Sequence, residues 1–274
     1  MTSVRIAAQN ASSDPAPGVT TGTLRSGDVA LAYAEAGNPD APLVLFIHGT
    51  PGSWHAFRPY LLDPALQAAS HMVAMDRPGF GESADVGVEG SLARQSKMLA
   101  PFLDMAHGHE VFLVGHSLGG TIAYRMAVDY PGRINGMVIV SSSISPELGG
   151  ARWYNRLASL PLISLLVPGD LRKANEEIMP LGDELAALTP RLGEIRMPVT
   201  IIHGKKDHLV SFRNVAYAER MLSSAKIRLI ADDNAGHFML WEQHTVIAEA
   251  IRTMLRNNSH AGASITKAQE GDNR

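Results

Sequence analysis

The sequence predicts a single α/β domain in which a mostly parallel sheet is covered by helices on both faces. The first observation is that short apolar segments alternate with helical patterns from residue 43 onward. The second is that these segments lack the polar alternation of a half-exposed strand, which is typical of parallel strands buried on both faces. The third is the length of 274 residues with 45% hydrophobic content, enough for one ordinary core.

The first residues of the chain predict an edge of this sheet. Residues 1–20 are rich in Ser, Ala, Pro and Gly, and we expect them to be loose. Residues 22–37 contain two short strand patterns around the turn Ser26-Gly27-Asp28. A glycine-containing turn between two strand patterns is typical of a hairpin. We therefore expect a hairpin at the sheet edge.

Further along, strand and helix patterns alternate, as expected of parallel strands joined by crossover helices. Predicted strands lie near residues 43–47, 72–75, 111–114, 136–140, 199–202 and 226–230. Predicted helices lie near residues 54–62, 89–105, 118–129, 215–222 and 241–257. Residues 21–257 are thus predicted to form one domain, followed by a disordered tail over residues 258–274.

One interval lacks a clear strand pattern. Residues 146–182 instead carry many apolar side chains, and we interpret them as a small helical cap inserted after the strand that ends near Val140. A cap excludes water from a site and shapes its pocket. We expect an apolar substrate pocket lined by residues of the cap and of the main domain, namely Trp54, Phe57, Trp153, Leu157, Leu162 and Leu166.

The segment Gly115-His116-Ser117-Leu118-Gly119 follows a strand pattern and precedes a helix pattern. Gly-x-Ser-x-Gly in this position is typical of a nucleophile elbow, in which a sharp turn exposes one serine hydroxyl. The N-terminus of the following helix favours negative charge beside that serine. We predict that Ser117 is a nucleophile. The structural alternative is an ordinary turn serine.

A serine nucleophile needs a base, and the base needs an orienting acid. Asp207 follows the apolar segment 199–204, and His237 lies in the loop after the strand pattern 226–230. Both therefore belong to the edge of a parallel sheet where ligands bind, in the chain order expected with this elbow. We predict a triad of Ser117, His237 and Asp207. The alternatives are that Asp207 caps the next helix and that His237 is an ordinary loop histidine.

The loop His48-Gly49-Thr50-Pro51-Gly52 follows the first predicted parallel strand. An oxyanion hole in this arrangement takes one N–H group from the residue after the nucleophile, here Leu118, and a second from such a loop. Thr50 is the best candidate for the second donor. His48 is expected to support the loop.

Five motifs together resemble the α/β-hydrolase fold family, in its esterase, lipase and C–C hydrolase branch. They are His48-Gly49-Thr50-Pro51-Gly52, Asp76-Arg77-Pro78-Gly79-Phe80-Gly81-Glu82-Ser83, Gly115-His116-Ser117-Leu118-Gly119-Gly120, Gly204-Lys205-Lys206-Asp207 and Gly236-His237. The resemblance implies the α/β-hydrolase fold, with a small cap after the strand that ends near Val140. It also implies a cis Thr50–Pro51 bond, which similar loops often contain. We expect Asp76 and Arg77 to brace the loops around the site.

These motifs imply a serine hydrolase that cleaves carboxylic esters of small to medium apolar substrates through an acyl-enzyme. C–C bond hydrolysis, lactone opening and perhydrolysis use the same triad and are alternatives, although His116 replaces the Asn usual in C–C hydrolases. Dehalogenases and epoxide hydrolases are disfavoured because their nucleophile is Asp. A non-catalytic ligand-binding protein is the alternative of another class.

The composition argues against several other functions. The formal net charge is −3 without a basic run, which speaks against nucleic-acid binding. The chain has no cysteine and no His-Glu-x-x-His pattern, so neither thiolate nor zincin-type metal sites are expected. No apolar run reaches about 18 residues, and the N-terminus lacks the apolar core of a secretory signal. We expect a cytoplasmic enzyme without metal or cofactor that acts on a small-molecule ester, and leave its oligomeric state open.

Overall fold

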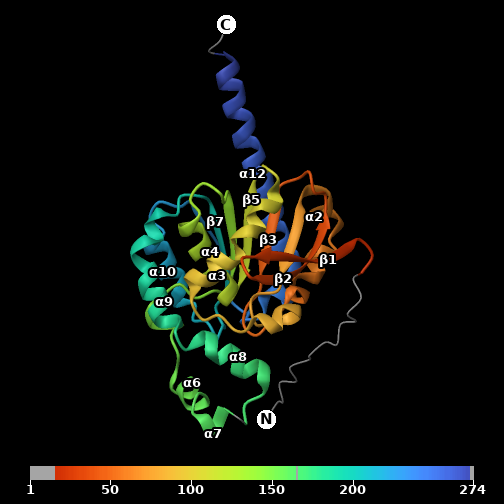
Figure 1. The fold of residues 1–274 in the computed structure, drawn as a ribbon. Coiled ribbons are helices and arrows are strands. Elements are labelled where there is room, and N and C mark those ends of the chain that lie inside the picture. Colours follow the sequence, from red (N-terminus) through yellow and green to blue (C-terminus); the bar gives the residue numbers. More distant parts are fainter. Residues whose placement is uncertain (1–15, 165, 272–274) are drawn as a thin grey trace.

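The computed structural model describes residues 16–164 and 166–271, with side chains described except at 161, 162 and 258–271. In this part of the chain eight strands form one sheet in the order β1-β2-β4-β3-β5-β6-β7-β8 (Figure 1). Their bounds are β1 (Val19–Ser26), β2 (Val29–Gly37), β3 (Leu43–Ile47), β4 (His71–Met75), β5 (Val111–His116), β6 (Gly136–Val140), β7 (Val199–Gly204) and β8 (Ile227–Asp232).

The described strands β3 to β8 run parallel, whereas β1 and β2 form an antiparallel hairpin at the edge. Both features confirm the predicted fold class. Ser26 pairs with Val29, and Gly27 between them has φ of +62°, which favours glycine. Strands β3 to β7 are buried along their whole length, which explains their continuous apolar sequences.

Helices and 3₁₀ turns cover both faces of the sheet. On one side lie α3 (Leu92–Leu99), η3 (Ala100–Ala106), α4 (Leu118–Asp129), α9 (Leu181–Leu188), η4 (Thr189–Glu194) and α10 (Arg213–Met221). On the other lie η1 (Trp54–Phe57), α1 (Arg58–Leu61), α2 (Pro64–Ala69), α11 (Met239–Glu242) and α12 (His244–Gly271). A further 3₁₀ turn, η2 (Gly81–Val86), follows β4.

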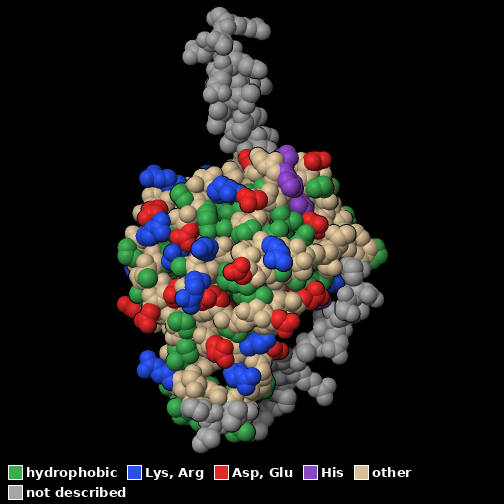
Figure 2. Space-filling model, in the orientation of Figure 1, with side chains coloured by type: hydrophobic (Ala, Val, Ile, Leu, Met, Phe, Trp, Pro, Cys, Tyr) green, Lys and Arg blue, Asp and Glu red, His purple; other side chains and the backbone are tan. Residues whose placement is uncertain are grey.

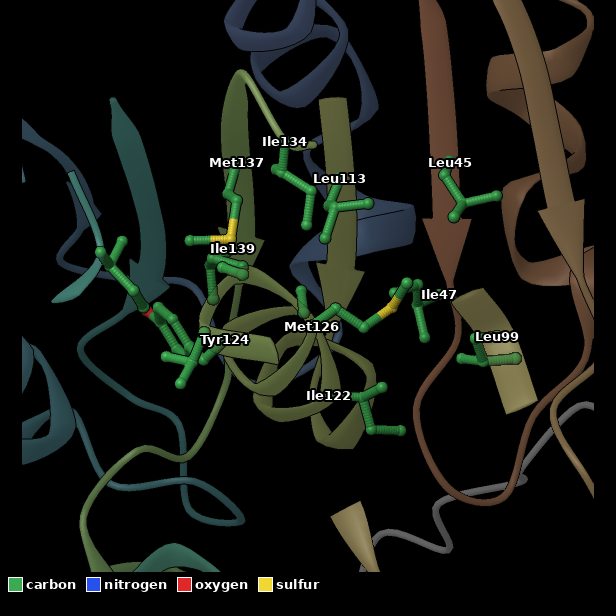
Figure 3. Packing of buried hydrophobic residues seen from close by; sticks show 14 of the residues in the cluster. Leu45, Ile47, Leu99, Leu113, Ile122, Tyr124, Met126, Ile134, Met137 and Ile139 are labelled. Atoms are coloured by element: carbon green, nitrogen blue, oxygen red, sulfur yellow. The ribbon is translucent and has the colours of Figure 1, made fainter. Parts of the chain in front are cut away.

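The alternation of side chains along each strand divides the core into two clusters. Leu45 and Ile47 of β3 belong to the first, with Ile122 and Met126 of α4, as Figure 3 shows. Phe46, between those two strand residues, belongs to the second cluster, under α12. The sheet is therefore held rigidly from both sides, and its carboxyl edge is a fixed platform for the loops that follow the strands.

Each predicted helix is present, although several are divided into shorter segments. Helix α2 was not predicted from the sequence. This helix has six residues, too few to show a helical period, and begins where the Asp63 carboxylate accepts the N–H groups of Ala65 and Leu66. In the described part of the chain, no helix combines the length and apolar character needed to cross a membrane.

The two ends of the chain also differ from expectation. Strand β1 begins at Val19, inside the segment 1–20 expected to be loose, and residues 1–15 lie outside the described residues. Helix α12 continues to Gly271, whereas we expected a disordered tail from residue 258. The tail sequence contains several helix-forming alanines, and extending an existing helix avoids the cost of nucleation. Residues 272–274 lie outside the described residues.

The interval between β6 and β7 contains α5 (Pro146–Gly149), α6 (Trp153–Ala158), α7 (Pro161–Ser164), α8 (Gly169–Ile178) and α9. In Figure 1, α6, α7 and α8 extend away from the sheet. At the base of this excursion, a Cβ added at Gly150 would lie 3.5 Å from the Gly182 Cα, so the outgoing and returning chains touch. A helical insertion thus occupies the predicted position of the cap. The division into domains stays a prediction.

Candidate active site

The turn between β5 and α4 carries Ser117. Its backbone has φ 53° and ψ −124°, a conformation that residues other than glycine rarely adopt. Its N–H donates to the Val140 carbonyl oxygen at 2.9 Å, which ties the turn to β6. A Cβ at Gly119 would lie 2.0 Å from the Ile47 carbonyl oxygen, so only glycine fits there. The chain therefore makes the sharp strand-to-helix turn that the motif predicts.

Asp207 and His237 meet at the same edge of the sheet. The His237 Nδ1–H donates to Asp207 Oδ2 at 2.8 Å, while Asp207 Oδ1 accepts the N–H groups of Leu209 and Val210 at 2.9 and 2.8 Å. Burial raises the pKa of the Asp207 carboxyl, but its bonds to His237 and Val210 outweigh burial and leave that pKa below its ordinary value. An ionised Asp207 therefore fixes the proton on Nδ1 and leaves Nε2 free to accept one.

Ser117 and His237 are brought to the same region without being bonded to each other. Among the described residues, the side-chain bonds of His237 include the one to Asp207 but none to Ser117. Catalytic hydrogen bonds often tighten only when substrate is bound. The acid–base half of the predicted triad is thus formed in this structure, and the nucleophile–base half stays a prediction.

His116, next to the nucleophile, connects the elbow to the histidine loop. Its Nε2 lies 3.2 Å from the His237 carbonyl oxygen, and its ring centroid lies 5.1 Å from those of His237 and Trp241. Burial, reinforced by His237, lowers the pKa of His116 to about 3. The imidazole is therefore neutral at ordinary pH and donates from Nε2.

The loop after β3 lies against the elbow. A Cβ at Gly49 would lie 2.9 Å from the Ser117 Cβ, so the loop backbone touches the serine directly. The Thr50–Pro51 bond is cis, as the resemblance implied. Leu118 is the first residue of α4, and its N–H has no partner within the helix. The two N–H groups predicted to form an oxyanion hole therefore belong to segments that flank Ser117.

The residues predicted to line the substrate pocket differ widely in exposure, and their role stays a prediction. Phe57 is fully buried and packs in the core, with its ring centroid 4.9 Å from that of Phe46. Trp54 is also buried in the core. On the cap, Trp153 and Leu166 are 76% and 83% exposed, and Leu157 is exposed as well. The Leu162 side chain lies outside the described ones. The sequence shows which residues are apolar, but tertiary packing decides which of them face a site.

Two exposed aromatic residues beside His237 were missed. The Phe238 ring centroid lies 5.8 Å from that of His237, and Phe238 and Trp241 are both about half-exposed. The sequence could have indicated Phe238, because it directly follows the predicted base His237. Within the described residues, no group of three or more His, Cys, Asp or Glu side chains could hold a metal ion.

Comparison with known proteins supports the fold and leaves the reaction open. The model of the alpha/beta hydrolase fold family matches residues 42–165. A haloalkane dehalogenase of Bradyrhizobium diazoefficiens is 31% identical over 110 residues, which are 40% of this chain and 35% of that protein. The acetyltransferase component of an acetoin-cleaving system of Cupriavidus necator is 36% identical over 113 residues, or 41% and 29% of the two chains. The chain thus matches about a third of each relative's length.

A solved structure also supports the fold. An epoxide hydrolase of Vigna radiata aligns with a TM-score of 0.69 over 88% of this chain and 98% of that one, at 16% identity. Together with the strand order and the helical insertion after β6, these matches show that the chain has the α/β-hydrolase fold. This fold supports many reactions, so the chemistry must be argued from the site itself.

Proposed function

We propose that this protein is a serine hydrolase that cleaves carboxylic esters of small to medium apolar substrates. The observation that carries the proposal is the His237–Asp207 hydrogen bond of 2.8 Å beside a serine held in a strained strand-to-helix turn. Strained backbone at a polar residue is typical of functional sites, and Ser117 is partly exposed. The half-exposed Phe238 and Trp241 support an apolar substrate, because the Phe238 ring lies beside the base and the Trp241 ring lies 5.9 Å from that of Phe238.

The proposed reaction proceeds in two halves. His237 Nε2 accepts the Ser117 hydroxyl proton as Oγ attacks the ester carbonyl carbon, while Asp207 stabilises the imidazolium. The tetrahedral oxyanion accepts hydrogen bonds from the N–H groups of Thr50 and Leu118. The intermediate collapses, the alcohol leaves with the proton from His237, and Ser117 remains acylated. Water then attacks the acyl-enzyme with His237 as base and releases the acid.

Serine at the nucleophile position distinguishes the proposed ester hydrolysis from dehalogenation and epoxide hydrolysis, the reactions named for two of the similar proteins. Dehalogenases and epoxide hydrolases of this fold use an aspartate, whose carboxylate attacks carbon directly, and the elbow of this chain carries Ser117 instead. C–C bond hydrolysis, lactone opening and perhydrolysis remain alternatives on the same three residues. A protein that only binds its ligand remains the alternative of another class.

A panel of p-nitrophenyl esters from acetate to decanoate tests the proposal. The wild type should release p-nitrophenol with a burst, and Ser117→Ala should lower kcat by at least about 10³-fold, because no other group can form the acyl-enzyme. Ser26→Ala, in the distant β1–β2 turn, is the matched control and should keep wild-type activity. Equal rates for the wild type and Ser117→Ala would show that the site is not a serine esterase.

A further inference from the structure

Arg77 is a fully buried cation next to the candidate oxyanion loop. All five of its guanidinium N–H groups have acceptors. Nε donates to the His48 carbonyl oxygen and Nη2 to the Gly49 carbonyl oxygen, both at 2.9 Å. The remaining donors bind Gln95 Oε1 at 2.9 Å and the two Glu177 oxygens at 2.5 and 3.1 Å. Burying such an ion pair is costly and contributes little net stability, so its position beside the oxyanion loop points to a role in the site.

The Gly49 carbonyl oxygen is held by two donors. One is Arg77 Nη2, and the other is His48 Nδ1 at 2.7 Å. His48 Nε2 accepts the Arg77 backbone N–H at 3.0 Å, so its proton must lie on Nδ1. Burial and the Arg77 charge keep the pKa of His48 well below its usual range, which preserves this neutral form.

The same peptide unit contains the Thr50 N–H. The cis bond of this loop is Thr50–Pro51, and the preceding Gly49–Thr50 bond is trans. In a planar trans peptide the C=O and the N–H point in opposite directions. Two donors that hold the Gly49 oxygen on one side therefore aim the Thr50 N–H to the other side. Gly49 lacks a Cβ, so its own backbone would not otherwise prevent the peptide from rotating.

We propose that Arg77 and His48 are positioning residues that orient the Gly49–Thr50 peptide as an oxyanion donor, and that Glu177 of the cap holds Arg77 in place. This inference rests on the proposed function, because it assumes that the Thr50 N–H binds the oxyanion. A cation at the carbonyl end also polarises the peptide and makes its N–H a stronger donor. Neither positioning residue touches the reacting atoms.

Glu177 makes the cap part of this arrangement. It lies on α8, is buried, and also accepts a bond from Gln95 Nε2 at 3.1 Å. One turn earlier on the same helix, Lys173 Nζ donates to the Gly79 carbonyl oxygen at 2.9 Å. Helix α8 is therefore seated on the loop after β4 by two charged side chains. If α8 moves away, Arg77 loses its carboxylate partner and its grip on the oxyanion loop.

Glu177 of the cap and Glu184, which lies just after the cap, provide a matched pair for the test. Glu177→Gln removes the charge that holds Arg77. Glu184→Gln makes the same change in α9, where Glu184 Oε2 accepts the Leu92 N–H at 2.7 Å, away from the oxyanion loop. With p-nitrophenyl acetate, Glu177→Gln should lower kcat about tenfold with little change in KM, because the donor acts in the transition state. Glu184→Gln should match the wild type in both constants.

The Thr50 amide resonance in ¹H–¹⁵N spectra gives a second readout that does not depend on esterase activity. It should shift in Glu177→Gln and Arg77→Met and stay in place in Glu184→Gln. Arg77→Met should lower kcat about 10²-fold. If Arg77→Met fails to fold, the kcat and the Thr50 resonance of Glu177→Gln are sufficient to test the positioning role.

The two hypotheses fail in different ways. An inactive wild type would remove the proposed function, while the Thr50 resonance would still test whether Arg77 orients the peptide. An unchanged Thr50 resonance and unchanged kcat in Glu177→Gln would overturn the positioning role.

Discussion

Asp207 makes the contacts of both roles that were expected as alternatives, a backbone cap and the acid of a triad. One carboxylate oxygen accepts two backbone N–H groups at the start of the following turn, as a capping residue does. The other oxygen accepts the His237 Nδ1–H. The backbone bonds limit rotation of the carboxylate and so aim the second oxygen at His237, while His203 Nε2 lies 3.5 Å from that same oxygen. A capping role therefore strengthens the proposed acid role.

Asp207→Asn separates these two roles. The amide oxygen can still accept the two backbone N–H groups, but its NH₂ group would face His237 and favour the wrong tautomer of the imidazole. We expect kcat for ester hydrolysis to fall by about 10⁴-fold, as for an acid-to-amide change in a related triad, with only a small change in unfolding midpoint. Asp233→Asn, which alters only an exposed pair with Lys205, is the control. Loss of less than tenfold in Asp207→Asn would rule out the acid role.

The residues of the candidate site differ in how far the sequence could predict them. Ser117, Asp207 and His237 each follow a strand pattern, and a parallel sheet brings such positions to one edge. Glu177 gave no such signal, because it lies in a helix 100 residues away from Arg77 and its burial arises only from the docking of that helix. Phe57 carried a misleading signal, because an apolar residue beside a site loop can equally belong to the core.

At the scale of elements, the cap is attached to the main domain unevenly. Its base is well packed, because Leu185 of α9 is fully buried in the core. Its outer helices α6 and α8 instead carry exposed apolar side chains, including Trp153 and Leu171. Figure 2 shows hydrophobic surface on this part of the molecule next to Lys and Arg side chains. Helix α6 therefore contributes little buried area to the stability of the domain, whereas α8 buries Ala174, Asn175 and Glu177.

Alanine substitutions measure this difference. Leu185→Ala should lower the free energy of unfolding by about 2–5 kcal/mol, because it leaves a cavity in the core. Trp153→Ala should change it by less than about 0.5 kcal/mol, because the side chain is 76% exposed. Urea unfolding followed by circular dichroism gives both values. A large loss in Trp153→Ala would mean that this side chain is covered in solution.

Strands were easier to predict than helices for a physical reason. A strand buried on both faces needs a continuous apolar run, which β3 to β7 all show. The helical segments depend on shorter-range features. Helix α2 begins through one capping aspartate, and η1 and α1 divide one predicted helix at Phe57. Helical periodicity alone does not show where such short segments begin and end.

At the scale of the whole molecule, several buried titratable groups make stability depend on pH. Burial lowers the pKa of His48, His116 and His203, so they stay neutral in the folded protein. In the unfolded chain they take up protons below a pH of about 6.5. The unfolded state then binds more protons, and stability falls as the pH falls. Asp76 acts in the opposite direction, because burial raises its pKa to about 6.

We therefore expect the free energy of unfolding to decrease from pH 7 to pH 5.5. At a pH one unit below the ordinary histidine pKa, each histidine with a strongly lowered pKa reduces the free energy of unfolding by about 1.4 kcal/mol. Asp76 offsets only part of the combined loss. His116→Gln keeps a donor for the His237 carbonyl oxygen but cannot be protonated, so its stability should fall less steeply. Denaturant titrations at several pH values give the slopes. Equal slopes for the variant and the wild type would contradict the assignment of His116.

The touching glycines at the base of the cap have a consequence for how this chain can be altered. Because Gly150 and Gly182 already meet, the segment between them leaves and rejoins the domain at one point. The entropy of closing such an excursion grows only slowly with its length. Caps of other lengths can therefore be grafted between these two residues without moving β6 or β7. Such a graft would have to supply its own counterpart of Glu177, since the present one leaves with the exchanged segment.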